Sequence, residues 1–207
     1  MSTAVQAGPA GPDVRVRAIP QSATRIVADG KFLRAVGGDR FLIKGVTYGT
    51  FTPDADGYQF PSPQQIAEDF RLMAGFGINT VRTYTPPRLY LLDEAARHGL
   101  RVMVGLPWAQ HVAFLDDRPL ARNIRRQIVR QVAELSRHPA ILAFALGNEI
   151  PSGVVRWHGR LRIENFLRGL YHAAKASSPD SLFTYVNFPP TEFLRSEERR
   201  VGKECRL

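Results

Sequence analysis

The sequence has 207 residues, of which 44% are hydrophobic and 10% aromatic, and its mean hydropathy is −0.20. A chain of this composition is not disordered, and it is long enough to form one globular domain with a sizeable core. No apolar run approaches the ~18–20 residues of a membrane-spanning helix, so we expect no membrane segment in this chain.

The formal net charge is +9, which raises the question of nucleic-acid binding. The positive residues are mostly arginines scattered along predicted helices, as at Arg122, Arg126 and Arg130, and no nucleic-acid motif accompanies them. We therefore expect a solvated basic surface and no nucleic-acid partner. The alternative is a basic surface that meets an acidic polymer or membrane headgroups.

Both ends of the chain differ in composition from the middle. Residues 1–24 are rich in small residues and show no basic segment followed by an apolar one. We expect a linker or disordered segment there, no secretory signal, and an unknown location with the cytoplasm as default. Residues 195–207, which hold the only cysteine, lack the periodicity of a strand or a barrel helix. They resemble a peptide translated from adaptor DNA, and a charged, frayed helix is the alternative. Residues 25–194 are the predicted folded domain.

The middle of the chain alternates between predicted strands and predicted helices. Turn residues at Asp29-Gly30 and Gly38-Asp39 predict a hairpin first. Five almost continuously apolar segments, typical of strands covered on both faces, then occur at 41–49, 78–84, 100–108, 141–149 and 182–190.

Helical patterns separate these segments. The first helix begins at the cap Ser62 with Pro63 in its first turn and ends at Gly77. Further helices are predicted between Pro86-Pro87 and Gly99, over about 119–137, and over about 160–177.

Strand–helix alternation predicts a parallel sheet, either open and doubly wound or closed into a barrel. No GxGxxG follows a strand, which disfavours a nucleotide-binding open sheet. Polar residues at the carboxyl ends of the strands favour a barrel. The predicted fold is α/β: a (β/α)8 TIM barrel, truncated to about five strand–helix units, with an N-terminal hairpin.

The most informative segment is 138–151, where an apolar strand ends in Gly147-Asn148-Glu149. A carboxylate at the end of a buried strand is costly to desolvate unless it opens into a cleft or meets a partner. At the mouth of a barrel it could act as a general acid, and the neighbouring amide suits a sugar hydroxyl. A helix cap or a simple turn is the alternative.

Four segments in order resemble a known group of enzymes: IKGVTYG, GINTVRTY, LDEAARHGLRVMVGLPW and HPAILAFALGNE. They are similar to the large (β/α)8-barrel clan of retaining glycosidases, closest to the barrel of the β-galactosidase/β-glucuronidase family. The resemblance covers about residues 27–194.

The resemblance implies roles for three residues. Glu149 would be the acid/base, Asn148 would contact the sugar 2-hydroxyl, and Arg82 would steady the nucleophile, although an arginine at a strand end can also pair with a surface acid. The clan's nucleophile, a glutamate on the seventh strand, has no counterpart in the sequence. No metal or organic cofactor is implied.

Aromatic residues at strand ends are further candidates for substrate binding. Trp108 could stack on a pyranose or simply belong to the core. Tyr48 and Tyr84 could line the cleft, and Trp157-His158 follows Glu149 where an added sugar subsite would form.

These observations predict a glycoside hydrolase that cleaves β-glycosidic bonds of an oligo- or polysaccharide with retention. The fragment alone is expected to be inactive and to belong to a longer multidomain protein. The alternatives are a β-glucan transglycosylase and a non-catalytic carbohydrate-binding module fused to a glycosyltransferase.

Overall fold

The computed structural model of the protein describes residues 24–187. The predicted tail over 195–207, and all of the predicted linker except Thr24, lie outside the described residues.

An antiparallel hairpin precedes the main sheet, as the sequence predicts. It consists of β1 (Ile26–Asp29) and β2 (Phe32–Ala35), with Ile26 opposite Ala35 and Asp29 opposite Phe32. Ile26 packs against Leu142 and Ala143 of the main sheet, so the hairpin covers one end of that sheet.

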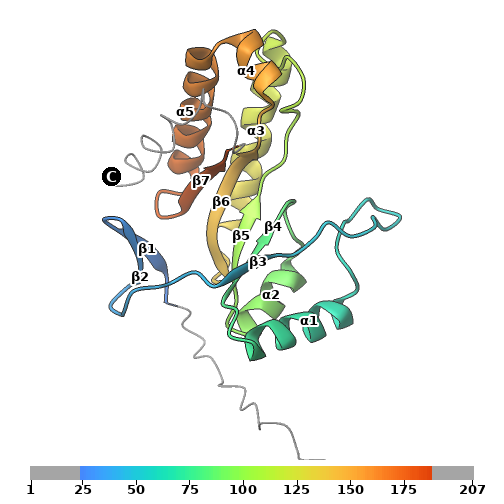
Figure 1. Cartoon of the computed structure of the whole chain (residues 1–207), viewed down its shortest axis with the longest axis vertical. Helices are drawn as coiled ribbons and strands as arrows, with labels where there is room; N and C mark the ends of the chain where they lie inside the picture. Colours follow the sequence, from blue (N-terminus) through green and yellow to red (C-terminus); the bar gives the residue numbers. More distant parts are fainter. Residues whose placement is uncertain (1–23, 188–207) are drawn as a thin grey trace, which may run out of the picture.

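Five parallel strands form the main sheet in chain order (Figure 1). They are β3 (Gly45–Thr47), β4 (Thr80–Thr83), β5 (Arg101–Gly105), β6 (Ile141–Asn148) and β7 (Leu182–Val186). Each pairs in parallel with the next, which is the strand order of consecutive units in a (β/α)8 barrel. The predicted incomplete barrel is therefore confirmed, and all five carboxyl ends lie at one rim.

Helices connect the strands at the positions that the sequence predicts, with one addition. They are α1 (Pro63–Gly75), α2 (Leu89–Arg97), α3 (Arg118–Leu135), α4 (Ser152–His158) and α5 (Arg160–Ser177). The Ser62 hydroxyl accepts a hydrogen bond from the Gln65 N–H at 3.3 Å, which confirms the predicted cap. The short α4 was not expected, because the sequence predicted no helix between Glu149 and residue 160.

The two faces of the sheet differ in burial. Val81, Val102, Val104 and Phe144 are completely buried in the main hydrophobic cluster, together with residues of the helices. Arg82 and Met103, which alternate with these residues and so point to the other face, are only partly buried. The helices thus cover one face, and the other face corresponds to the barrel interior.

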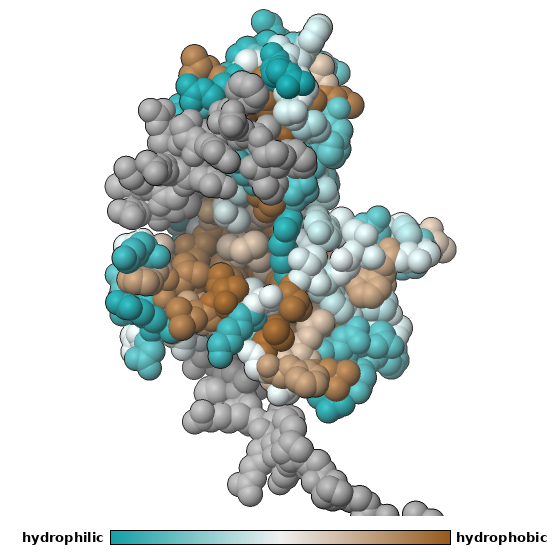
Figure 2. Space-filling view, viewed as in Figure 1, coloured by the Kyte–Doolittle hydropathy of each residue, from teal (hydrophilic) through white to brown (hydrophobic). Residues whose placement is uncertain are grey.

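The prediction that every strand is covered on both faces fails at β3, whose three residues are all exposed. Among the described residues β3 pairs only with β4, and the exposed hydrophobic residues Leu42, Ile43 and Val46 lie in or just before it. Figure 2 shows hydrophobic residues gathered on this side of the molecule, between the hairpin and the strands. The open barrel interior explains this exposure.

No helix within residues 24–187 combines the length and the apolarity that crossing a membrane requires.

Gly105 is required where β5 passes β4. A Cβ atom at this position would lie 2.5 Å from the Tyr84 carbonyl oxygen and 2.6 Å from that of Thr83. Since both contacts are with backbone, we expect Gly105→Ala to lower the free energy of unfolding by about 1–3 kcal/mol. Urea denaturation followed by circular dichroism would measure the change.

Gly169→Ala is the matched control, because Gly169 lies in α5 and a Cβ there would meet nothing within 4 Å. We expect this variant to be more stable by about 0.5–1 kcal/mol, since alanine favours a helix. Equal effects of the two substitutions would contradict the close approach of β4 and β5.

Candidate active site

Two polar side chains meet inside the rim formed by the carboxyl ends of the strands. Arg82 comes from β4 and Asn148 from β6, and the Arg82 Nη2 atom donates a hydrogen bond to Asn148 Oδ1 at 2.6 Å. Strand β5 lies between them, so the bond crosses one strand on the interior face. The structure thus joins two of the residues that the sequence selected.

Glu149 follows Asn148 in an unusual backbone conformation. Its φ is +49°, and no other described residue except glycine has a positive φ. Its N–H donates to the Val186 carbonyl of β7 at 2.8 Å, which holds this conformation in place. A left-handed non-glycine residue costs on the order of 1 kcal/mol and is often found where a side chain must point in a functional direction.

Trp108 supports the end of β6 from the helical side. Its indole N–H donates to the Leu146 carbonyl at 2.9 Å, and its rings meet Phe114 and Phe166 edge-on. Gly147 makes this approach possible, because a Cβ there would lie 2.8 Å from Trp108 Nε1. Only 9% of Trp108 is exposed, which favours a core role over stacking on a sugar.

Tyr48 also lies in the core rather than in a cleft. Only 4% of the residue is exposed, and its ring packs against Phe51, Phe60 and Phe70. Its hydroxyl donates to Asp69 Oδ2 at 2.6 Å, and burial raises its pKa well above the ordinary range. The expectation that Tyr48 lines the cleft is therefore wrong: its side chain is directed to the helical layer.

Tyr84 remains at the rim, where 39% of it is exposed. The Arg82 guanidinium carbon lies 4.9 Å from its ring centroid, within the range of a cation–π contact. This contact and the bond to Asn148 fix the arginine from two sides. A part in substrate binding stays a prediction for Tyr84, as it does for Arg82 and Asn148.

Tyr185 is a rim residue that the sequence interpretation missed. Its hydroxyl accepts a hydrogen bond from the Ile150 N–H at 2.9 Å, directly after Glu149. Burial raises the pKa of Tyr185 to about 12; the Ile150 bond lowers it, and the Glu149 carboxylate raises it further. The hydroxyl is therefore protonated at neutral pH. Its place near the end of the fifth apolar segment was the available signal.

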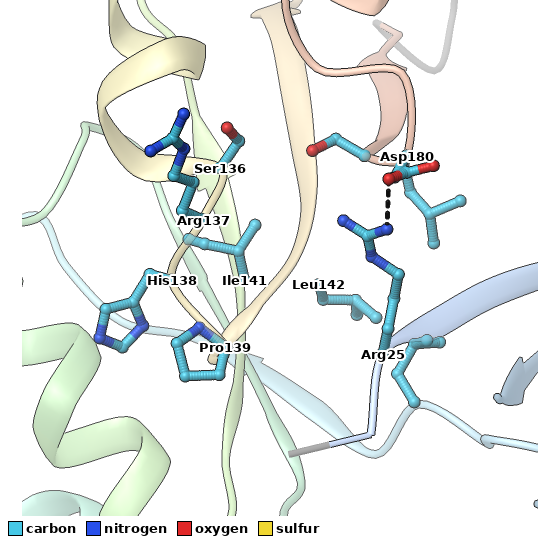
Figure 3. A pocket seen from close by; sticks show the side chains of 11 residues that line it. Arg25, Ser136, Arg137, His138, Pro139, Ile141, Leu142 and Asp180 are labelled. Atoms are coloured by element: carbon cyan, nitrogen blue, oxygen red, sulfur yellow. Dashed lines mark ion pairs between the residues drawn. The ribbon is translucent and has the colours of Figure 1, made fainter. Parts of the chain in front are cut away.

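A cavity of about 230 Å³ lies at the opposite end of the strands (Figure 3). It is lined by the starts of β6 and β7, at Ile141 and Leu182, and an ion pair of 2.7 Å joins Arg25 to Asp180 at its wall. The active sites of barrel enzymes lie at the other rim, where the strands end, so this cavity is separate from Glu149. Within residues 24–187, no three His, Cys, Asp or Glu side chains are grouped as a metal site would require.

Solved structures share this fold at low sequence identity. The β-glucuronidase of Faecalibacterium prausnitzii is 22% identical, with a TM-score of 0.63 over 78% of this chain and 27% of that one. The β-glucuronidase of Parabacteroides merdae is 18% identical, with a TM-score of 0.62 over 77% of this chain and 20% of that one. An exo-β-1,4-mannosidase from an Opitutaceae bacterium is 21% identical, with a TM-score of 0.63 over 76% and 34%.

Sequence comparison leads to the same group. A β-glucuronidase of Bacteroides fragilis is 27% identical over 94 residues, which are 42% of this chain and 14% of that protein. The chain thus matches only a small part of each of these longer relatives. Residues 26–198 match the profile described as "Glycosyl hydrolases family 2, TIM barrel domain". Since that match covers most of the chain, the protein belongs to glycosyl hydrolase family 2, and the matched residues are part of the family's TIM barrel domain.

Proposed function

We propose that this chain supplies the acid/base half of a retaining β-glycosidase, with Glu149 as the acid/base. The observation that carries the proposal is the Arg82–Asn148 hydrogen bond beside the left-handed Glu149 at the carboxyl rim. Glu149 would protonate the glycosidic oxygen as the bond breaks and later take a proton from the attacking water.

The hydrogen bond determines which group Asn148 offers to a substrate. Its Oδ1 atom accepts from Arg82, so the amide NH₂ is left as the donor. That donor would meet a sugar hydroxyl and hold the ring beside Glu149. Without Arg82 the amide could turn over and present its oxygen instead.

Arg82 has a further donor to offer. Its Nε atom is buried and has no hydrogen-bond partner among the described residues. An unsatisfied buried donor costs about 1–3 kcal/mol, which a carboxylate at this place would offset. We propose that this carboxylate is the nucleophile, supplied by a strand beyond the five described and about 5 Å from Glu149.

The names of the relatives suggest the first substrates to test. The similar structures described above include two β-glucuronidases and an exo-β-1,4-mannosidase. We propose an aryl β-glucuronide as the first substrate, with aryl β-mannoside and β-galactoside beside it.

In a polypeptide that supplies the remaining strands of the barrel, Glu149→Gln removes the acid while it keeps the shape. We expect kcat to fall on the order of 10²–10⁴-fold on a substrate with a poor leaving group, and less on one with an acidic phenol. Steady-state rates on the two substrates would measure the difference. An unchanged rate on the poor leaving group would exclude Glu149 as the acid.

Retention has its own readout. Proton NMR at early times shows whether the first product has the β or the α configuration, and a double-displacement mechanism gives β. An α product would mean that water attacks directly and that no glycosyl-enzyme forms.

We also propose that residues 1–207 alone do not turn over these substrates. An acid without a facing nucleophile cannot form the glycosyl-enzyme intermediate. Release of aryl aglycone by the purified chain should therefore equal that of its Glu149→Gln variant. Clear release above that variant would mean that the nucleophile lies within this sequence.

A further inference from the structure

We propose that Trp157 forms a second sugar-binding subsite, on the rim outside the position of the cleaved bond. The ligand would be a further pyranose ring of an oligosaccharide chain. The inference rests on the proposed function for the class of ligand, but it is carried by a different set of residues.

Trp157 is unusually exposed for a tryptophan in an ordered helix. In this residue 72% of the surface is accessible, against 9% in Trp108, the other tryptophan of the chain. An indole ring has a large apolar surface, and leaving it in water forgoes about 2 kcal/mol or more of burial free energy. Such a ring is a natural contact for a ligand.

The ring is nevertheless held in place. The Trp157 indole N–H donates to Asp116 Oδ2 at 2.6 Å. Asp116 lies in the connection from β5 to α3, and Trp157 lies on α4, which begins three residues after Glu149. The bond therefore joins the two connections that follow β5 and β6, and Figure 1 shows α4 beyond the end of β6.

Two further side chains lie close to the Asp116 carboxylate that binds the indole. Arg162 Nη2 lies 3.6 Å from Asp116 Oδ1, and His158 Nδ1 lies 3.6 Å from the same oxygen. The His158 side chain is fully buried, meets Phe114 edge-on and accepts a long hydrogen bond from the Leu115 N–H. Burial lowers the pKa of His158, and the Trp157 bond lowers that of Asp116. The indole is thus positioned before any ligand arrives, which reduces the entropic cost of binding.

The surroundings of the ring suit a sugar. A pyranose has an apolar face of C–H groups and a rim of hydroxyls, so it needs a flat aromatic surface beside polar groups. Trp157 offers the flat surface, while Asp116 and Arg162, with 47% and 57% of their side chains exposed, offer an acceptor and a donor. A protein partner would have to bury these two charged side chains as well, which is costly.

The intrinsic fluorescence of the full chain can test the subsite, because its only other tryptophan is buried. Tetrasaccharides of β-1,3-linked glucose, β-1,4-linked glucose and β-1,4-linked mannose serve as probes, added to millimolar concentration. We expect at least one to shift the Trp157 emission to shorter wavelength and to protect it from acrylamide. Trp157→Phe should abolish the shift.

Calorimetric titration with the responding sugar gives the affinities of matched variants. Trp157→Ala should weaken binding about tenfold or more, as the loss of a central aromatic contact does. Asp116→Ala, which keeps the ring but frees it, should have a smaller effect. Phe76→Ala is the control, because Phe76 is an even more exposed aromatic residue at the end of α1 and should leave binding unchanged.

The outcomes separate this inference from the proposed function. Glu149→Gln should bind the sugar as the unsubstituted chain does, since the readout is emission and heat rather than turnover. If no probe changes the Trp157 emission, or if Trp157→Ala binds as well as Phe76→Ala, the subsite does not exist, whatever the role of Glu149. A response from Trp157 without turnover in the completed enzyme would reject only the proposed function.

Discussion

The site depends on one contact, the hydrogen bond from Arg82 to Asn148 across strand β5. It forms because β4 and β6 run in the same direction, so that their carboxyl ends lie at one rim. The bond gives the Arg82 guanidinium a hydrogen-bond acceptor in the barrel interior, and it orients the Asn148 amide beside Glu149. The spacing of the strands therefore sets the distance between polar groups that come from distant parts of the sequence.

The helical layer contributes equally to the placement of Glu149. Trp108 bonds to the Leu146 carbonyl and lies against Gly147, while the Val186 carbonyl of β7 holds the Glu149 N–H. The strand end is therefore fixed on its outer face and by its neighbour. A left-handed glutamate is tolerated because these contacts together outweigh its backbone strain.

The sequence was sufficient for the hairpin, the order of strands and helices, and the choice of Arg82 and Asn148 as polar residues at strand ends, since periodicity and strand-end position determine these. It was insufficient for the direction of side chains at strand ends. Tyr48 and Trp108 stand at strand ends as Tyr84 does, but they turn to the helical face, and only the backbone decides which face a residue near a bend will meet. Helix α4 was missed because seven residues are too few for a periodic pattern.

The contact between Gly147 and Trp108 bears on how such a barrel can diversify. Neither residue offers its side chain to a ligand, yet together they fix the end of the strand that carries Glu149. The connection after β5 includes Trp108 near its start, so this part of it belongs to the fixed point, while Asp116 lies near its other end. Under the proposed function, the sequence near Asp116 can therefore change the preference for a sugar while Trp108 and Glu149 stay in place. The connections at the rim can vary in this barrel because the packing of Trp108 against Gly147 holds the end of β6 rigidly.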